Sequence, residues 1–287
     1  MDEHNVARCP HAHECGGCKT QDLPYEQQLI QKEVYLRDLF QGIWDEPIPL
    51  DPSPEIWHYR NKIELNFDRM QYEVPPPRDF VRESVLGFKK KGKWYHTLDL
   101  TTCLIAPKGT DRLMASIRRW MTAHDLRAWF QKNNDGLLRY LLVREGKHTG
   151  DLMVVLISRT GDIPRDSFVD AVRSAIPATS IYHATFDGRA DAAYMESLTL
   201  LAGEDRIQEK LMIDGRELFF SISPQGFFQT NTLATQVLYG RIRELVKEIK
   251  QFIKPNQIIL LKGSNGTGLW KLVPIFKNII QENANAA

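Results

Sequence analysis

The stretch LLRYLLVREGKHTGDLMVVLIS, residues 137–158, contains two apolar runs that flank a polar turn. Leu137–Arg144 and Leu152–Ser158 are rich in Leu and Val, and the segment Gly146–Gly150 between them begins and ends with glycine. Short apolar runs on either side of such a turn predict a β-hairpin.

Helical segments alternate with strand segments on both sides of this hairpin. Apolar residues that recur every three or four positions predict helices over residues 24–40, 110–124 and 165–175. Apolar and polar residues that alternate, or short apolar runs between turn signals, predict strands over 59–67, 86–88, 94–100, 180–186 and 218–222. Hairpins and helices in alternation predict an α+β body.

The C-terminal part has a different pattern. A long apolar stripe predicts a helix over 232–253, and Ile258–Leu261 then reads as a buried strand that enters a glycine-rich loop. A helix, strand and glycine-rich loop in this order predict the start of an α/β, Rossmann-like domain. We therefore expect three parts: a loop and helix over 1–54, a central α+β domain over 55–222, and the start of the α/β domain over 223–287.

Composition excludes several classes of protein. The 37 Lys and Arg residues balance 36 Asp and Glu residues, so the net charge is +1 and a protein coated with basic residues is excluded. No apolar stretch approaches the roughly 20 residues of a membrane span, and the polar N-terminus does not resemble a signal peptide. We expect a cytoplasmic monomer with no membrane partner, in a reducing compartment where disulfides are rare.

Three of the four cysteines lie within ten residues of one another, which is typical of a metal site. Cys15 and Cys18 are separated by two glycines that permit a tight turn, and Cys9 and the distant Cys103 complete four thiols. Four thiolates suit a [4Fe–4S] cluster or a tetrahedral zinc ion. Histidines beside the thiols leave a Cys3His zinc site open, and free buried thiols are the third alternative.

Five motifs, in this order along the chain, resemble those of one protein family. The family is that of the RNA uracil-5-methyltransferases, specifically the iron–sulfur members that act on 23S ribosomal RNA. The five motifs are Cys9-x5-Cys15-Gly16-Gly17-Cys18, Tyr59-Arg60-Asn61-Lys62, Leu98-Asp99-Leu100-Thr101-Thr102-Cys103, Arg144-x-Gly146-Lys147-His148-Thr149-Gly150 and Ser223-Pro224-Gln225-Gly226-Phe227-Phe228-Gln229-Thr230-Asn231.

The resemblance implies an activity and a set of site residues. Members of the family transfer a methyl group from S-adenosylmethionine to C5 of a uridine, after a cysteine thiolate has added to C6 of the base. Cys9, Cys15, Cys18 and Cys103 are similar to the four ligands of the [4Fe–4S] cluster. Gln229 is similar to the glutamine that contacts S-adenosylmethionine. From the residues alone, the alternative is that Gln229 caps the helix that begins near Thr232.

Basic residues on the predicted strands and turns are candidate RNA contacts in an otherwise neutral chain. The alternatives are ion pairs with neighbouring strands and a hairpin tip that contacts only solvent. Arg139 and Arg144 add to a possible basic surface. The candidate RNA-binding residues are Arg60, Lys62, Lys89, Lys90, Lys91 and Lys93.

The chain departs from the family near residue 260. Leu260 stands where the family has an acidic residue, the cysteine of the glycine-rich loop is absent, and no cysteine follows Cys103. We therefore expect a chain that is truncated within the methyltransferase domain, that has no catalytic residue, and that is inactive alone. A non-catalytic iron–sulfur RNA-binding module and a zinc-bearing nucleic-acid-binding protein are the alternatives.

Overall fold

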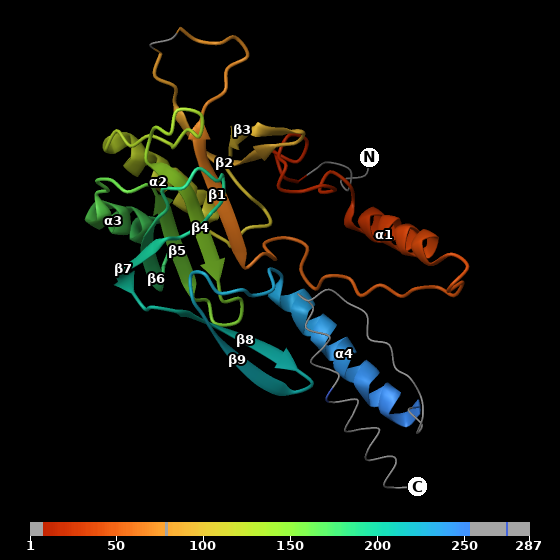
Figure 1. Ribbon diagram of the computed structural model, residues 1–287. Coiled ribbons are helices and arrows are strands. Elements are labelled where there is room, and N and C mark those ends of the chain that lie inside the picture. Colours follow the sequence, from red (N-terminus) through yellow and green to blue (C-terminus); the bar gives the residue numbers. More distant parts are fainter. Residues whose placement is uncertain (1–7, 78–79, 253–273, 275–287) are drawn as a thin grey trace. The chain divides into compact units, whose positions relative to one another are not determined.

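The computed structural model describes residues 8–77, 80–252 and 274 (Figure 1). The chain divides into two units, Met1–Thr235 and Gln236–Ala287. All of the strands and the first three helices belong to the first unit. The predicted strand Ile258–Leu261 and the glycine-rich loop after it lie outside the described residues, as do the departures from the family near residue 260. The predicted boundaries at 54/55 and 222/223 remain predictions.

A mixed seven-stranded sheet forms the body of the first unit. Its spatial order is β3-β2-β1-β4-β5-β6-β7, and of the neighbouring pairs only β5 and β6 are parallel. The predicted hairpin is therefore present as β4–β5, and it lies near the middle of the sheet. The strands are β1 Lys62–Arg69, β2 Ser84–Lys90, β3 Lys93–Asp99, β4 Leu138–Glu145, β5 Leu152–Ser158, β6 Ser180–Thr185 and β7 Ser197–Gly203.

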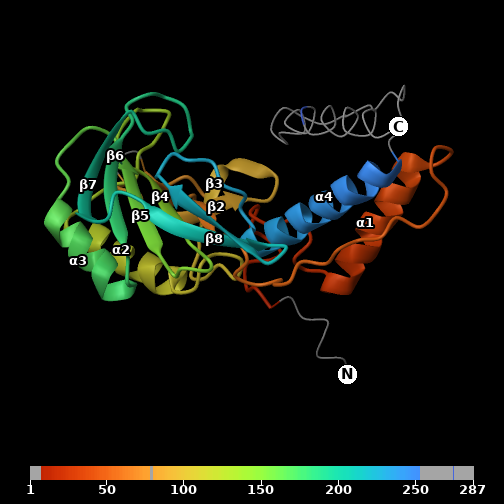
Figure 2. The same cartoon turned by 90° about the horizontal axis from the view of Figure 1, so that it is seen from below.

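Two helices cover one face of this sheet. Figure 2 shows α2 (Thr110–Ala123) and α3 (Arg165–Ala175) side by side on the same side of the strands. Leu113, Ile117 and Phe168 of these helices are completely buried in one core with alternate residues of β1, β4 and β5. The apolar stripes that predict these helices are thus the faces that they bury.

The other face of the sheet packs against a separate two-stranded hairpin. This hairpin is formed by β8 (Ile207–Ile213) and β9 (Arg216–Ile222), and its residues Ile207 and Ile222 share a second core with Tyr140, Leu142 and Met153. Because the strand residues of the two cores alternate along β4 and β5, both faces of the central strands are buried. The strand β9 was predicted, whereas β7 and β8 were not.

The remaining two helices also match the sequence prediction. Helix α1 (Tyr25–Phe40) follows the cysteine-rich loop and buries none of its residues. Helix α4 (Thr232–Phe252) begins where Asn231 Oδ1 accepts a hydrogen bond of 3.0 Å from the backbone N–H of Ala234. This bond makes Asn231 the N-cap, so the alternative that Gln229 caps this helix is wrong. None of the helices in the described part is long and apolar enough to cross a membrane.

A buried arginine ties the central strands to the loop that follows β6. Arg139 is 1% exposed, and its guanidinium donates hydrogen bonds to the carbonyl oxygens of Phe186, Gly188 and Ala190. The same guanidinium lies 3.8 Å from the centroid of the Trp129 ring and 4.4 Å from that of Phe186. The expectation that Arg139 belongs to a basic surface is therefore wrong, because its buried guanidinium binds carbonyl oxygens and aromatic rings inside the protein.

We expect Arg139→Lys to destabilise the first unit by about 2–4 kcal/mol, because an ammonium group reproduces neither the fork of donors nor the stacking between two rings. Urea unfolding at neutral pH measures the free energy. Arg127→Lys is the matched control, since the Arg127 side chain is 50% exposed. Equal losses in the two variants would contradict this account.

Candidate functional site

The loop Ser223–Asn231, which carries Gln229, is held by side chains from two other motifs. Arg144 at the end of β4 is 3% exposed and donates hydrogen bonds of 2.6 Å to the carbonyl oxygens of Ser223 and Gly226. Asn61, just before β1, donates from Nδ2 to the Gln229 carbonyl at 2.7 Å and to Thr232 Oγ1 at 2.8 Å. Arg144 therefore orders this loop, and the expectation that it lies on a basic surface is wrong.

The carboxylate of Glu209 in β8 connects these groups to the turn of the β4–β5 hairpin. Glu209 is completely buried, and its Oε2 accepts hydrogen bonds from the Lys147 backbone N–H at 2.8 Å and from Thr232 Oγ1 at 2.9 Å. Its Oε1 accepts a bond of 3.1 Å from the His148 N–H. A Cβ at Gly146 would lie 2.1 Å from the Gln208 carbonyl oxygen, so only glycine fits at this approach.

Gln229 itself presents a free amide. Its backbone carbonyl is fixed by Asn61, whereas its half-buried side chain forms no hydrogen bond within the described part of the chain. Nearby, Phe228 packs against Phe220 with ring centroids 5.3 Å apart, and Phe227 is 83% exposed. The loop thus combines a fixed backbone with polar and aromatic side chains that are available to a ligand.

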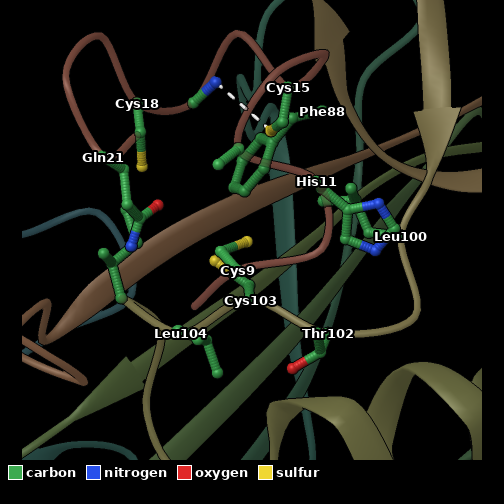
Figure 3. A pocket seen from close by; sticks show the side chains of 13 residues that line it. Cys9, His11, Cys15, Cys18, Gln21, Phe88, Leu100, Thr102, Cys103 and Leu104 are labelled. Atoms are coloured by element: carbon green, nitrogen blue, oxygen red, sulfur yellow. Dashed lines mark hydrogen bonds between the residues drawn. The ribbon is translucent and has the colours of Figure 1, made fainter. Parts of the chain in front are cut away.

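All four cysteines line one small cavity, as their spacing predicts (Figure 3). Cys9, Cys15 and Cys18 come from the N-terminal loop, and Cys103 comes from the segment after β3. The loop is attached to the β2–β3 hairpin, because the backbone N–H of Gly16 donates to the Lys89 carbonyl at 2.8 Å and Lys91 N–H donates to that of Glu14 at 2.7 Å. The hairpin therefore places distant thiols together.

The surroundings of the thiols affect their ionisation. Burial, and after it the neighbouring Cys103 and Cys15 thiols, raise the pKa of Cys18 to about 11, and burial also raises the pKa of Cys15 and of Cys103. The backbone N–H of Gly17 donates to Cys15 Sγ at 3.4 Å, a contact that favours the thiolate. Thiolates gathered in this way need a positively charged partner to be stable.

The described residues include no group of three or more His, Cys, Asp or Glu side chains arranged so that they could hold a metal ion. All four cysteines nevertheless line one cavity, and the Gly17 N–H donates to Cys15 Sγ. The choice between iron–sulfur, zinc and free thiols stays a prediction.

Most of the lysines that were predicted to contact RNA form ion pairs or hydrogen bonds within the protein. Lys89 pairs with Asp68 at 3.1 Å and with Asp191 at 3.2 Å, and Lys90 pairs with Glu14 at 2.7 Å. Lys91 Nζ donates to the Ala12 carbonyl at 2.8 Å, so Lys90 and Lys91 both attach the N-terminal cysteine loop to the β2–β3 hairpin. Lys93 at the turn is exposed.

The two basic residues before and in β1 differ from each other. Lys62 pairs with Glu64 on the same strand at 2.6 Å, and not with a neighbouring strand as the ion-pair alternative predicts. Arg60 is half-buried beside Cys18 and lines a groove next to the cysteine cavity. A role for any of the six basic residues in RNA binding stays a prediction.

No family model matches the chain, but single proteins do. The tRNA (uracil(54)-C(5))-methyltransferase of Pyrococcus horikoshii is 33% identical over 242 residues, which cover 84% of this chain and 52% of that protein. An uncharacterized RNA methyltransferase of Caldanaerobacter subterraneus is 32% identical over 248 residues, with 84% of this chain and 52% of that protein covered. The chain spans about half the length of these curated relatives.

The fold also matches a solved structure. It is the crystal structure of the tRNA (uracil-54, C5)-methyltransferase of Pyrococcus abyssi in complex with S-adenosyl-L-homocysteine, with a TM-score of 0.63 and 27% identity over 82% of this chain and 52% of that one. The mixed sheet is thus similar to that of an RNA methyltransferase. Within this class, the relatives, the solved structure and the five motifs agree that the chain is similar to the RNA uracil-5-methyltransferases.

The network around the Gln229 loop was not recognised from the sequence. Asn61 and Arg144 stand in quoted motifs, but nothing in their spacing connects them with a loop some 80 or more residues away. Glu209 carries a weak signal, since it occupies a buried position in the alternating pattern of β8. A carboxylate at an apolar position of a strand indicates a buried hydrogen-bond network.

We expect Asn61→Asp to destabilise the Gln229 loop by about 2–4 kcal/mol, because a carboxylate removes both donors and faces a carbonyl oxygen and the Glu209 network. Thermal unfolding and limited proteolysis of Ser223–Asn231 measure the effect. The exposed Asn133→Asp is the matched control, and equal cleavage of the loop in both variants would refute the prediction.

Proposed function

We propose that this protein binds RNA and presents a uridine at the Gln229 loop for S-adenosylmethionine-dependent methylation at C5. The observation that supports the proposal is the fixed loop Ser223–Asn231, in which Arg144 and Asn61 hold the backbone while the Gln229 amide stays available. A loop ordered before the ligand arrives binds it at a lower cost in conformational entropy.

Gln229 would contact S-adenosylmethionine, which supplies an electrophilic methyl group when it is bound. A side-chain amide both donates and accepts hydrogen bonds, so it suits the polar groups of such a ligand. The exposed ring of Phe227, two residues before it, offers a stacking surface for a base. The hydrogen bonds that the Asn61 and Arg144 side chains donate to the loop carbonyls would keep Gln229 and Phe227 in place.

Addition to C6 of the base requires a thiolate that is free to react. The chain has four cysteines, and all four line the cavity formed by the N-terminal loop and the segment around Cys103. If these thiols hold a cluster, none remains as the nucleophile. We therefore propose that the 287 residues bind RNA but do not transfer a methyl group by themselves.

Two kinds of RNA are candidate substrates. The resemblance favours 23S ribosomal RNA, whereas the names of the Pyrococcus relatives refer to uracil 54 of tRNA. Unmodified transcripts of tRNA and of a 23S rRNA domain distinguish these substrates when they compete for the same protein.

We expect the purified chain to bind one of these transcripts with strong salt dependence, and to transfer no labelled methyl group from S-adenosylmethionine to either. Filter binding and scintillation counting measure the two properties, with DNA of the same sequence as the control. Equal binding of RNA and DNA would contradict RNA recognition. Methyl transfer above background would assign one of the four cysteines as the nucleophile.

We also propose that Cys9, Cys15, Cys18 and Cys103 hold a [4Fe–4S] cluster, whose role would be to cross-link the N-terminal loop to the segment after β3. Protein purified without oxygen should be brown and contain about four irons per chain. Cys18→Ser and Cys103→Ser should each lose the colour and lower the melting temperature, because metal binding is coupled to folding. Stoichiometric zinc without iron would refute the cluster.

A further inference from the structure

A second, larger hollow lies beside the cysteine cavity. It has a volume of about 740 Å³, which is within the roughly 300–1,000 Å³ of ligand sites in proteins. The cysteine loop, the first turns of α1 and the segment 53–60 line it, and Asn231 of the Gln229 loop lies at its edge. All of these residues belong to the first unit. We call this hollow the α1 groove.

The α1 groove is lined by more cations than carboxylates, and its cations are not held in salt bridges within the described part of the chain. Arg8, Lys19, Lys32 and Arg60 line the groove, and none of them forms a salt bridge with a residue of the described part. They outnumber the three carboxylates of the lining, which are Asp22, Glu26 and Glu55. The lysines of the β2–β3 turn differ, because Lys89 and Lys90 are paired with carboxylates. Free cations are the ones that attract an anionic ligand.

Three aromatic side chains, all half-buried, line the same groove. They are Tyr25, Trp57 and Tyr59, and the guanidinium of Arg8 lies 5.4 Å from the centroid of the Trp57 ring. Tyr25 is oriented by a hydrogen bond of 2.7 Å that its hydroxyl accepts from the Ser53 backbone N–H. Aromatic rings interleaved with unpaired cations are the combination that binds unstacked bases and their phosphates.

The backbone between two of these rings is held in an uncommon conformation. His58, which separates Trp57 from Tyr59, has a φ of 51°, in the left-handed region. Its backbone N–H donates to the Leu104 carbonyl at 2.6 Å, its ring Nδ1 bonds the Ala106 carbonyl at 2.8 Å, and its own carbonyl accepts from Lys147 Nζ. Strain that is maintained by three hydrogen bonds is characteristic of functional segments.

We propose that the α1 groove binds a single-stranded segment of the RNA that flanks the target uridine, with bases stacked on Trp57 and Tyr59 and phosphates near Arg8 and Arg60. The inference rests on the proposed function. Asn231 lines the groove and lies two residues beyond Gln229, so a strand in the groove reaches the loop where the uridine would be presented. A paired duplex does not expose its bases to these rings, so the groove selects single strands.

The test uses the complete chain and a fluorescein-labelled decauridylate, with a fully paired RNA hairpin as the competitor. Fluorescence anisotropy, without any methyl donor, measures the affinity. Trp57→Ala should weaken binding about 5- to 100-fold, and Trp57→Phe should restore most of it because a ring is retained. Trp44→Ala is the control, since Trp44 is 55% exposed and lies outside the groove lining.

Arg8→Ala gives an independent measurement on an exposed side chain whose loss leaves the core intact. It should reduce the slope of log K against log salt by about 0.7, the value for one phosphate contact with a single strand. The proposal that the α1 groove binds RNA would be overturned by either of two results. One is a folded Trp57→Ala variant that binds RNA as tightly as the wild type, and the other is an unchanged slope of log K against log salt in Arg8→Ala. Absence of RNA binding by the wild type would instead overturn the proposed function.

Discussion

The buried carboxylate of Glu209 is the group on which the arrangement of the candidate site depends. It accepts hydrogen bonds from the Gly146–Gly150 turn and from Thr232, and Thr232 in turn accepts from Asn61. A buried charge without such donors would be strongly unfavourable, so the carboxylate requires the turn, the start of α4 and the approach to β1 to stay together. The β8–β9 hairpin, which has only two strands, is anchored to the sheet by the same bonds and by the second core.

The five motifs are explained by two places in the folded chain. Three of them meet at the Gln229 loop, and the other two meet at the cysteine cavity. Arg144, Asn61 and the loop itself form the first group, and the N-terminal thiols with Cys103 form the second. Each group joins segments that are far apart in sequence. The stability of both sites therefore depends on the sheet that brings these segments together.

Much of the fold could be predicted from periodicity, because the predicted helices α2 and α3 and the β4–β5 hairpin bury their apolar residues in one core. Helix α1 was also predicted, although it buries none of its residues. The missed strand β7 lies at the end of the sheet, and most of its residues are exposed. The strand β8 alternates well, but Glu209 stands at one of its buried positions. The cysteine cavity was predictable from spacing, whereas the partners of Lys89 and Lys90 were not, since Asp191 and Glu14 are far away in sequence.

Consecutive residues before β1 connect the two sites. Arg60 faces the α1 groove beside Cys18, while Asn61 reaches the Gln229 carbonyl and Thr232. Successive side chains of an extended segment point to opposite sides. The backbone bridge between Arg60 and Asn231 therefore fixes the side to which Arg60 points and, with it, the opposite side to which Asn61 points. A shift of one residue would exchange the guanidinium and the amide and disrupt both sites. The register of this short segment therefore couples the loop that would present a uridine to the groove that would bind the RNA.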